Sequence, residues 1–227
     1  MLLLEGNVVF GKIEYLNLLP FHVFMKRFVR SSQASMSMNY HKDVPAKTNK
    51  KFLLRRVDAA FISSIRAKGR EHINLGIIAK KEVLSVIVTP SQKHLSDKES
   101  ETSNLLAKIL HLKGEVLIGD KALRYSLQNK PYIDMAKRWN ETYNLPFVFA
   151  LLCYHKDKNL YKKIEKNFLK KKIKIPRYIL KEAASRTQVS EQNILRYLTY
   201  ISYDFDTKAK RGVQKFYKEA QKWSPIR

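Results

Sequence analysis

The chain has a single cysteine among its 227 residues, so it can form no internal disulfide and no cysteine-based metal site. That residue, Cys153, lies in the apolar run FVFALLCY, where a small buried side chain is far more common than a nucleophile. The six histidines are scattered and include no His-x-x-x-His pair. The sequence therefore predicts no metal site and no thiol chemistry.

Long hydrophobic runs are also missing. No stretch approaches the ~18 consecutive apolar residues that a membrane-spanning helix needs. The first residues, MLLLEGNVVF, are interrupted by Glu5 and carry neither a basic segment nor a small-residue cleavage site. We therefore expect no membrane insertion, no secretion signal and a cytoplasmic location.

Acidic residues are few, because 20 Asp and Glu stand against 44 Lys and Arg, which leaves a formal net charge of +24. Such an excess favours anionic partners in general. It is spread along the chain, however, since residues 151–227 hold 20 of the basic and 7 of the acidic residues. A solvated basic surface is therefore the simpler interpretation, and nucleic acid is not an expected partner.

The order of the apolar segments predicts an α/β fold. Branched, apolar segments typical of buried strands occur at 8–13, 57–65, 73–79, 83–90, 115–120 and 145–154. Helical patterns occur at 20–29, 46–55, 105–112, 133–139, 159–171, 177–187, 191–203 and 207–223. The polar stretch 31–51 is expected to form a loop with at most one strand, and the helix expected at 46–55 begins near its end. The alternation of strands and helices in the first half favours a mainly parallel sheet.

Six segments taken together resemble the motif series of the chorismate dehydratase family, which acts in the futalosine route to menaquinone. They are GKIEYLNLLPF (11–21), VDAAFISSI (57–65), VLSVIV (83–88), ESETSNLLAKIL (99–110), VLIGDKAL (116–123) and LPFVFALL (145–152). They follow the family's order over most of residues 8–155, and RYLTYISYDF (196–205) is a weaker match. The agreement of six segments in order is specific, although no single one would be.

This resemblance implies a fold similar to that of type II periplasmic binding proteins, with two α/β lobes, two crossing strands and a ligand cleft between the lobes. Lobe 1 would comprise residues 1–86 and 156–227, and lobe 2 residues 87–155. The crossing strands would be VLSVIV and FVFALL. Clefts between lobes and the carboxyl ends of strands are favoured places for small-molecule sites. The short passage from LLAKILHLKGE into VLIGD implies a trimmed lobe 2.

The activity implied by the resemblance is that of a hydro-lyase converting chorismate to 3-[(1-carboxyvinyl)oxy]benzoate and water, without a metal or other cofactor. Such an enzyme must orient a ring, bind two carboxylates and stabilise charge while a ring proton leaves. No histidine occupies a matching motif position. Our hypothesis for the base is therefore a carboxylate of the substrate itself, with the protein supplying geometry.

Two residues are the candidates for catalysis. Asn17 matches the family's Tyr-Leu-Asn motif, and its amide can donate to one substrate oxygen and accept from another. The alternative for Asn17 is a helix N-cap, a position that Asn also fills well. Ser85 lies in the outward crossing strand, where its hydroxyl would face the cleft. The alternative for Ser85 is a core serine with its hydrogen bonds satisfied.

Six further residues are candidates for substrate binding: Ser63, Ser64, Thr102, Ser103, Asn104 and Asp120. The three residues 102–104 open a helix, where free N–H groups and two hydroxyls suit a carboxylate, although a plain capped helix is the alternative. The serine pair 63–64 closes a strand and would line the opposite wall. For Asp120 we prefer a structural or orienting role, because a carboxylate would repel a dianionic substrate.

Two other functions compete with this hypothesis. Residues 179–202 are similar to a helix-turn-helix, but Gln188 occupies the turn position where Gly is usual. A non-catalytic solute-binding protein of the same fold is the second alternative, and the expected lack of a secretion signal disfavours it. The sister naphthoate synthase of the same pathway shares the fold but is less similar at the motif 15–17.

Overall fold

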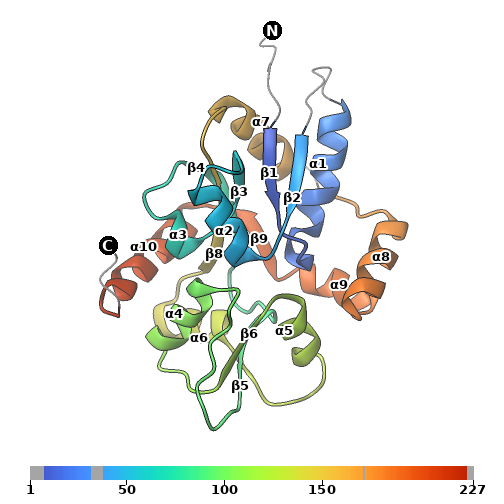
Figure 1. The fold of residues 1–227 in the computed structure, drawn as a ribbon. Helices are drawn as coiled ribbons and strands as arrows, with labels where there is room; N and C mark the ends of the chain where they lie inside the picture. The colour runs from blue at the N-terminus through green and yellow to red at the C-terminus, as the bar shows by residue number, and fades with distance from the viewer. Residues whose placement is uncertain (1–7, 32–37, 171, 224–227) are drawn as a thin grey trace.

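The computed structural model describes residues 8–31, 38–170 and 172–223, so residues 32–37 of the expected loop and residue 171 lie outside the described part. In chain order the elements are β1 (Val8–Lys12), η1 (Leu16–Leu18), α1 (Leu19–Ser31), β2 (Met38–Lys42), α2 (Pro45–Leu53), β3 (Ala59–Ser63), α3 (Ser64–Ala67), β4 (His72–Ala79), β5 (Val86–Thr89), α4 (Glu101–Ile109), β6 (Glu115–Ile118), α5 (Gly119–Ser126), β7 (Ile133–Asp134), α6 (Met135–Tyr143), β8 (Phe147–Tyr154), α7 (Lys158–Leu169), α8 (Arg177–Thr187), α9 (Glu191–Leu198), β9 (Ile201–Asp204) and α10 (Thr207–Gln221). They form two lobes, each built around its own sheet (Figure 1).

The larger sheet has six strands in the order β2-β1-β3-β8-β4-β9. Strand β1 is parallel to both β2 and β3, whereas β8 is antiparallel to β3 and β4, and β9 is antiparallel to β4. The expectation of a mainly parallel sheet is therefore wrong. The reason is that β8 and β9 arrive from later parts of the chain and enter beside β4 in the opposite direction.

The smaller sheet has three antiparallel strands in the order β6-β5-β7, and Figure 1 shows it below the larger sheet, together with α4, α5 and α6. Strand β5 begins at Val86, later than expected, because Leu84 has a φ of 60° and the Ser85 N–H donates to the Val83 carbonyl at 2.7 Å. Strand β8, which contains the expected return crossing strand FVFALL, pairs along its length inside the larger sheet. The chain thus passes between the sheets at 80–85 and again at 144–146, next to these strands.

Two of the expected helices are bounded by a short strand. The helix expected at 133–139 begins at Met135, because β7 precedes it and the Asp134 carboxylate caps it by accepting from the Lys137 N–H at 3.0 Å. The helix expected at 191–203 ends at Leu198, and β9 follows it. The apolar pattern continues through this boundary, but pairing with the free edge of β4 favours a strand.

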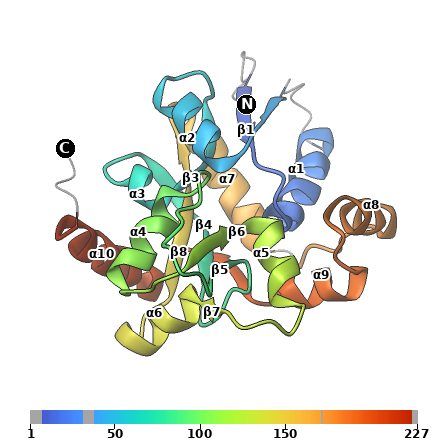
Figure 2. The same ribbon diagram turned by 60° about the horizontal axis from the view of Figure 1, so that its bottom comes forward.

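The pair α8–α9 has the helix-turn-helix outline that the sequence suggested, with Gln188 in the left-handed conformation at a φ of 55°. Ile194 and Tyr197 on α9 are buried in the core. Figure 2 shows this pair on the opposite side of the molecule from α10. One face of α9 is therefore used for packing within this chain.

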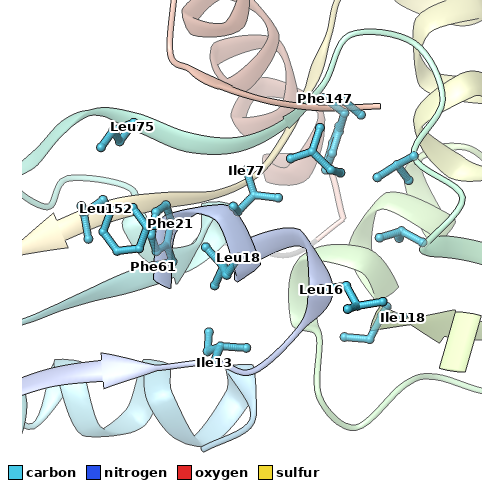
Figure 3. Close-up of a cluster of buried hydrophobic side chains, with 14 of the residues drawn as sticks. Ile13, Leu16, Leu18, Phe21, Phe61, Leu75, Ile77, Ile118, Phe147 and Leu152 are labelled. Carbon is cyan, nitrogen blue, oxygen red and sulfur yellow. The ribbon is translucent and has the colours of Figure 1, made fainter. Parts of the chain in front are cut away.

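The main hydrophobic core includes side chains from both sheets. In Figure 3, Leu16 of η1 points toward Ile118 of β6, while Phe21 and Phe61 lie deeper in the larger lobe with ring centroids 5.0 Å apart. The segment around η1 therefore packs against both lobes. None of the helices in the described ranges is long and apolar enough to cross a membrane.

Candidate active site

Two hollows are candidates for a functional site. The interlobe cavity, of about 80 Å³, lies between the two sheets and is lined by side chains from both. The basic groove, of about 530 Å³, lies between β1, β2, α1 and α8. Of the predicted site residues, the cavity is lined by Asn17, Ser63, Ser85 and Ser103, and the groove by none. The smaller hollow is therefore the candidate active site.

The lining of the interlobe cavity is neutral. Its polar side chains are hydroxyls and one amide: Tyr15, Asn17, Ser63, Ser85, Ser100 and Ser103. Its apolar walls include two phenyl rings, those of Phe61 and Phe149. Among the residues that line it, none carries a charge. Such a site suits a planar ring with oxygen substituents, because short-range donors surround an apolar slot.

Asn17 is the residue of η1 that reaches the cavity. Its carbonyl accepts from the Tyr203 hydroxyl at 2.6 Å, while its side-chain amide makes no hydrogen bond to the described residues. It caps neither helix, since Tyr15 precedes η1 and α1 begins at Leu19. The amide is therefore free to bind a ligand, and the alternative of an N-cap does not account for it.

Ser85 lies at the junction of the two lobes, immediately before β5. It is 2% exposed, lines the cavity, and its Oγ accepts from the Tyr197 hydroxyl at 2.8 Å. Its backbone is fixed on both sides, because its carbonyl also accepts from the Gly119 N–H at 2.8 Å. Ser85 thus has a buried partner behind it and the cavity in front of it.

The first turn of α4 contributes two hydroxyls. Ser100 is the N-cap, and its Oγ accepts from the Ser103 N–H at 3.1 Å and donates to the Ser103 Oγ at 2.7 Å. Both serines line the cavity. The cap therefore lies two residues before Thr102, the first residue that the sequence suggested for it. Because the first N–H groups of a helix have no partner within it, this turn can bind an anion.

The other two residues of the expected anion site face elsewhere. Thr102 is 1% exposed and its Oγ1 accepts from the Ile65 N–H at 3.2 Å, which joins α4 to α3. The Asn104 amide accepts from the Asp97 N–H at 2.8 Å and donates to the Asp97 carbonyl at 2.7 Å. Both side chains brace the backbone behind the cavity.

The two serines at the end of β3 also separate. Ser63 lines the cavity and its Oγ accepts from the Asn49 amide at 2.8 Å, while the Asn49 side chain accepts from the Ser63 N–H at 3.1 Å. Ser64 is fully buried and its hydroxyl donates to the Val148 carbonyl of β8. Ser64 therefore ties α3 to β8 and has no place on the cavity wall.

Asp120 lies in the first turn of α5, behind the cavity lining. Its Oδ1 accepts from the Leu16 N–H at 3.0 Å and its Oδ2 from Arg186 Nη1 at 3.3 Å. Burial raises the pKa of the Asp120 carboxyl, and the Leu16 N–H and the Arg186 guanidinium oppose that rise. This carboxylate thus links lobe 2 to η1 and to α8, an arrangement that suits an orienting role.

Gly119 and Tyr15 meet at the edge of the cavity. Gly119 has a φ of 67°, and a Cβ on it would lie 2.7 Å from the Tyr15 ring. The Tyr15 hydroxyl donates to Glu99 of lobe 2, and burial raises the pKa of this phenol far above its usual value. Only glycine allows the ring and the strand end to approach so closely.

Three contributors lay outside the sequence prediction of the site: Tyr15, Ser100 and Tyr197. The serine was detectable, because it stands at the capping position before the acidic first turn of a predicted helix. Tyr197 was not, because 112 residues separate it from Ser85. Tyr15 was indicated only as a member of the motif 15–17, and nothing in the sequence marked its ring as part of the cavity.

Comparison with known proteins gives a consistent result. A family model described as menaquinone biosynthesis matches residues 8–115 and 111–222. A curated chorismate dehydratase from Campylobacter jejuni is 43% identical over 215 residues, which cover 93% of this chain and 96% of that protein.

Solved structures show similarity of fold alone. A protein from Archaeoglobus fulgidus has a TM-score of 0.71 at 12% identity, covering 98% of this chain and 100% of that one. A Candida albicans protein with the generic periplasmic binding protein fold has a TM-score of 0.55 at 12% identity, covering 95% and 90%. The alkanesulfonate-binding protein of Xanthomonas axonopodis pv. citri has a TM-score of 0.54 at 11% identity, covering 94% and 93%. These similarities confirm the predicted two-lobed fold.

Proposed function

Because the chain belongs to the menaquinone biosynthesis family, we propose that it is a chorismate dehydratase, a hydro-lyase that forms 3-[(1-carboxyvinyl)oxy]benzoate and water. The observation that carries the proposal is the neutral interlobe cavity, in which hydroxyls and one free amide surround two phenyl rings. These groups suit a small ring bearing carboxylates and a hydroxyl. The 43% identity with a chorismate dehydratase selects this ring among others of that kind.

The reaction removes one ring hydrogen and the ring hydroxyl. The electron pair of the broken C–H bond enters the ring, the C–O bond breaks, and the departing hydroxyl leaves with a proton as water. In our proposal the Asn17 amide donates to the departing hydroxyl as negative charge develops on it. A preorganised donor of this kind is typically worth about 2.7–4 kcal/mol of barrier.

The two carboxylates require donors, because burying a charge without partners is expensive. We propose that the first turn of α4 binds one of them, through the helix N-terminus and the hydroxyls of Ser100 and Ser103. Ser63 and Ser85 would hold other oxygens of the substrate from the remaining walls. The rings of Phe61 and Phe149 would keep the substrate ring in one plane.

No carboxylate or imidazole is among the side chains that line the interlobe cavity, so a protein base is not at hand. The proposal therefore assigns the proton transfer to a carboxylate of the substrate. The protein's contribution is to hold that carboxylate beside the C–H bond, and correct orientation alone can lower a barrier by several kcal/mol.

The cavity of about 80 Å³ is smaller than the range of about 300–1,000 Å³ that is common for ligand sites. We propose that the lobes separate to admit the substrate and close around it. The segments 80–85 and 144–146 are the places where the chain crosses, and they would take up the change in backbone angles.

The test is a turnover assay on the purified protein. Chorismate without added metal or nucleotide is expected to yield the aromatic enolpyruvyl ether, seen by its ultraviolet absorbance and by mass spectrometry. A chelator is expected to leave the rate unchanged. Tight binding of chorismate without product would instead support the solute-binding alternative, and strict dependence on a divalent ion would contradict the cofactor-free mechanism.

A further inference from the structure

A buried tyrosine from the C-terminal region lies directly behind Ser85. Tyr197 of α9 is 2% exposed, and its hydroxyl donates to Ser85 Oγ at 2.8 Å. The structure gives this hydroxyl no second hydrogen bond among the described residues. Helix α9 is itself fixed, because Ser190 caps it by accepting from the Asn193 N–H at 3.2 Å, and Ile194 is fully buried.

The phenol is the more acidic of the two hydroxyls, so we take it as the donor in this contact. A serine hydroxyl has one hydrogen to donate and two lone pairs that accept. The phenol hydrogen of Tyr197 occupies one lone pair of Ser85 Oγ on the core side. The hydrogen of the serine is then left for an acceptor on the other side, which is the interlobe cavity.

We propose that Tyr197 is a positioning residue that fixes the Ser85 hydroxyl as a donor toward the substrate. The inference rests on the proposed function and extends it, because it gives a role in the site to a residue of α9 that does not itself line the cavity. Two hydroxyls in series polarise each other, so the serine becomes a stronger donor to an anionic oxygen than it would be alone. Without Tyr197 the serine hydrogen could turn away from the cavity.

The structure also offers a matched control. Tyr203 of β9 is a half-buried tyrosine a few residues later in the chain, and its hydroxyl donates to the backbone carbonyl of Asn17 at 2.6 Å. Each of Tyr197→Phe and Tyr203→Phe removes one hydroxyl and one hydrogen bond near the cavity. Only the first of them acts on the Ser85 side chain.

The experiment is a double-mutant cycle measured by turnover of chorismate. In the parent, Tyr197→Phe is expected to lower kcat/KM about 5- to 10-fold, mainly through kcat, which is the effect of one typical hydrogen bond. In a Ser85→Ala background the same substitution should change kcat/KM by less than about 2-fold, because the partner hydroxyl is gone. Tyr203→Phe should have the same effect in both backgrounds.

The outcomes separate the two claims. An equal loss from Tyr197→Phe with and without Ser85 would overturn the positioning role and leave the proposed function standing. Absence of turnover by the parent protein would overturn the proposed function itself. If Tyr197→Phe did not fold, as judged by circular dichroism, Tyr197→Met would take its place in the cycle. Methionine, like phenylalanine, is apolar and lacks the hydroxyl, and it is of similar length.

Discussion

The interlobe cavity and the basic groove are separated by one segment of chain, residues 12–19, and they have opposite chemistry. Lys12, Glu14 and Leu19 face the groove, Ile13, Asn17 and Leu18 face the cavity, and Tyr15 lines both. The groove has four cationic side chains, Lys12, Lys26, Lys42 and Arg186, against two acidic ones, Glu14 and Glu182. The residues that line the cavity are all neutral.

This difference shows that the net charge of +24 says little about the candidate site. Charges in the groove are near solvent and are partly paired, since Glu14 lies 2.9 Å from Lys12 Nζ and 3.2 Å from Lys42 Nζ. Such pairs contribute little and are screened by salt. In the cavity, uncharged donors are held at fixed positions. The binding of a ligand there would depend on how well its oxygen atoms match those positions.

The largest expected effect comes from adding a charge to the neutral cavity. Asn17→Asp removes a donor and places a carboxylate beside a dianion, so we expect kcat/KM to fall by about 10²–10³, the cost of one preorganised donor. The melting temperature should change little, because the amide has no partner within the described structure. Steady-state kinetics and thermal unfolding measure both.

The control for this substitution is Asn129→Asp, which makes the same change at an exposed turn. Its turnover should equal that of the parent. Parental turnover by Asn17→Asp would show that the site lies elsewhere and that the contrast between the two hollows has no catalytic meaning.

The second effect tests the rim of the cavity. Gly119→Ala forces an alanine into the left-handed region and places its Cβ 2.7 Å from the Tyr15 ring. We expect a loss of about 2–3 kcal/mol of unfolding free energy, since left-handed backbone alone costs about 1–2 kcal/mol. Urea denaturation measures this loss, and turnover should fall with it because the ring of Tyr15 must move.

Gly69→Ala is the matched control, because Gly69 has a φ of 72° and a Cβ added there would meet no other atom within 4 Å. Its loss should be limited to the backbone cost of about 1–2 kcal/mol, with turnover unchanged. Equal losses of unfolding free energy in both variants would mean that the Tyr15 ring moves aside at no energetic cost.

The third prediction concerns His22, which lines the groove and holds the chain segment that separates the groove from the cavity. His22 donates from Nε2 to the Ile13 carbonyl at 2.8 Å, and burial lowers the pKa of this imidazole to about 4. Because the folded pKa lies below the unfolded value, stability is complete above about pH 6.5 and is lost as the pH falls toward 4. With allowance for partial contact with solvent, we expect a loss of about 2 kcal/mol.

Denaturation curves between pH 7 and pH 4 measure this dependence. His22→Gln keeps a donor for the Ile13 carbonyl but cannot gain a proton, so its stability should depend less on pH over this range by about the same 2 kcal/mol. An identical pH dependence in parent and variant would refute the assignment to His22.

The smallest effect is expected from the charges of the groove. Lys26→Gln and Lys42→Gln should each lower kcat/KM by at most about 2-fold at low salt, with kcat unchanged, since they act only on the approach of an anion. The difference should vanish at high ionic strength. A salt-independent loss, or a loss in kcat, would show that the groove takes part in the reaction.

The strands that the sequence predicted best are those with their own local signal. Segments 8–13 and 57–65 are short, branched and apolar, and both form strands of the larger sheet. The strand β9 could not be found in this way, because the apolar spacing of α9 continues through Ile201. What ends the helix is the free edge of β4, a partner more than 100 residues earlier in the chain.

The candidate site shows the same limit at the level of single side chains. Motif similarity led to Asn17, Ser63, Ser85 and Ser103, all of which line the cavity. Within one motif, however, consecutive residues of a helix point about 100° apart, so Thr102 and Asn104 face other partners than Ser103 does. A motif identifies the segment, and packing decides which of its residues reach the cavity.

The place of β8 between β3 and β4 has a consequence for how the chain folds. Ser63 and Ala150 are paired across this sheet although the whole of lobe 2 lies between them in the chain. The centre of the larger sheet therefore closes only after a long loop has closed, and folding slows as contact order rises. Until β8 arrives, β3 and β4 each leave a bare apolar edge, the kind of surface on which partly folded chains associate. We expect this protein to refold slowly, with aggregation competing against the insertion of a single strand.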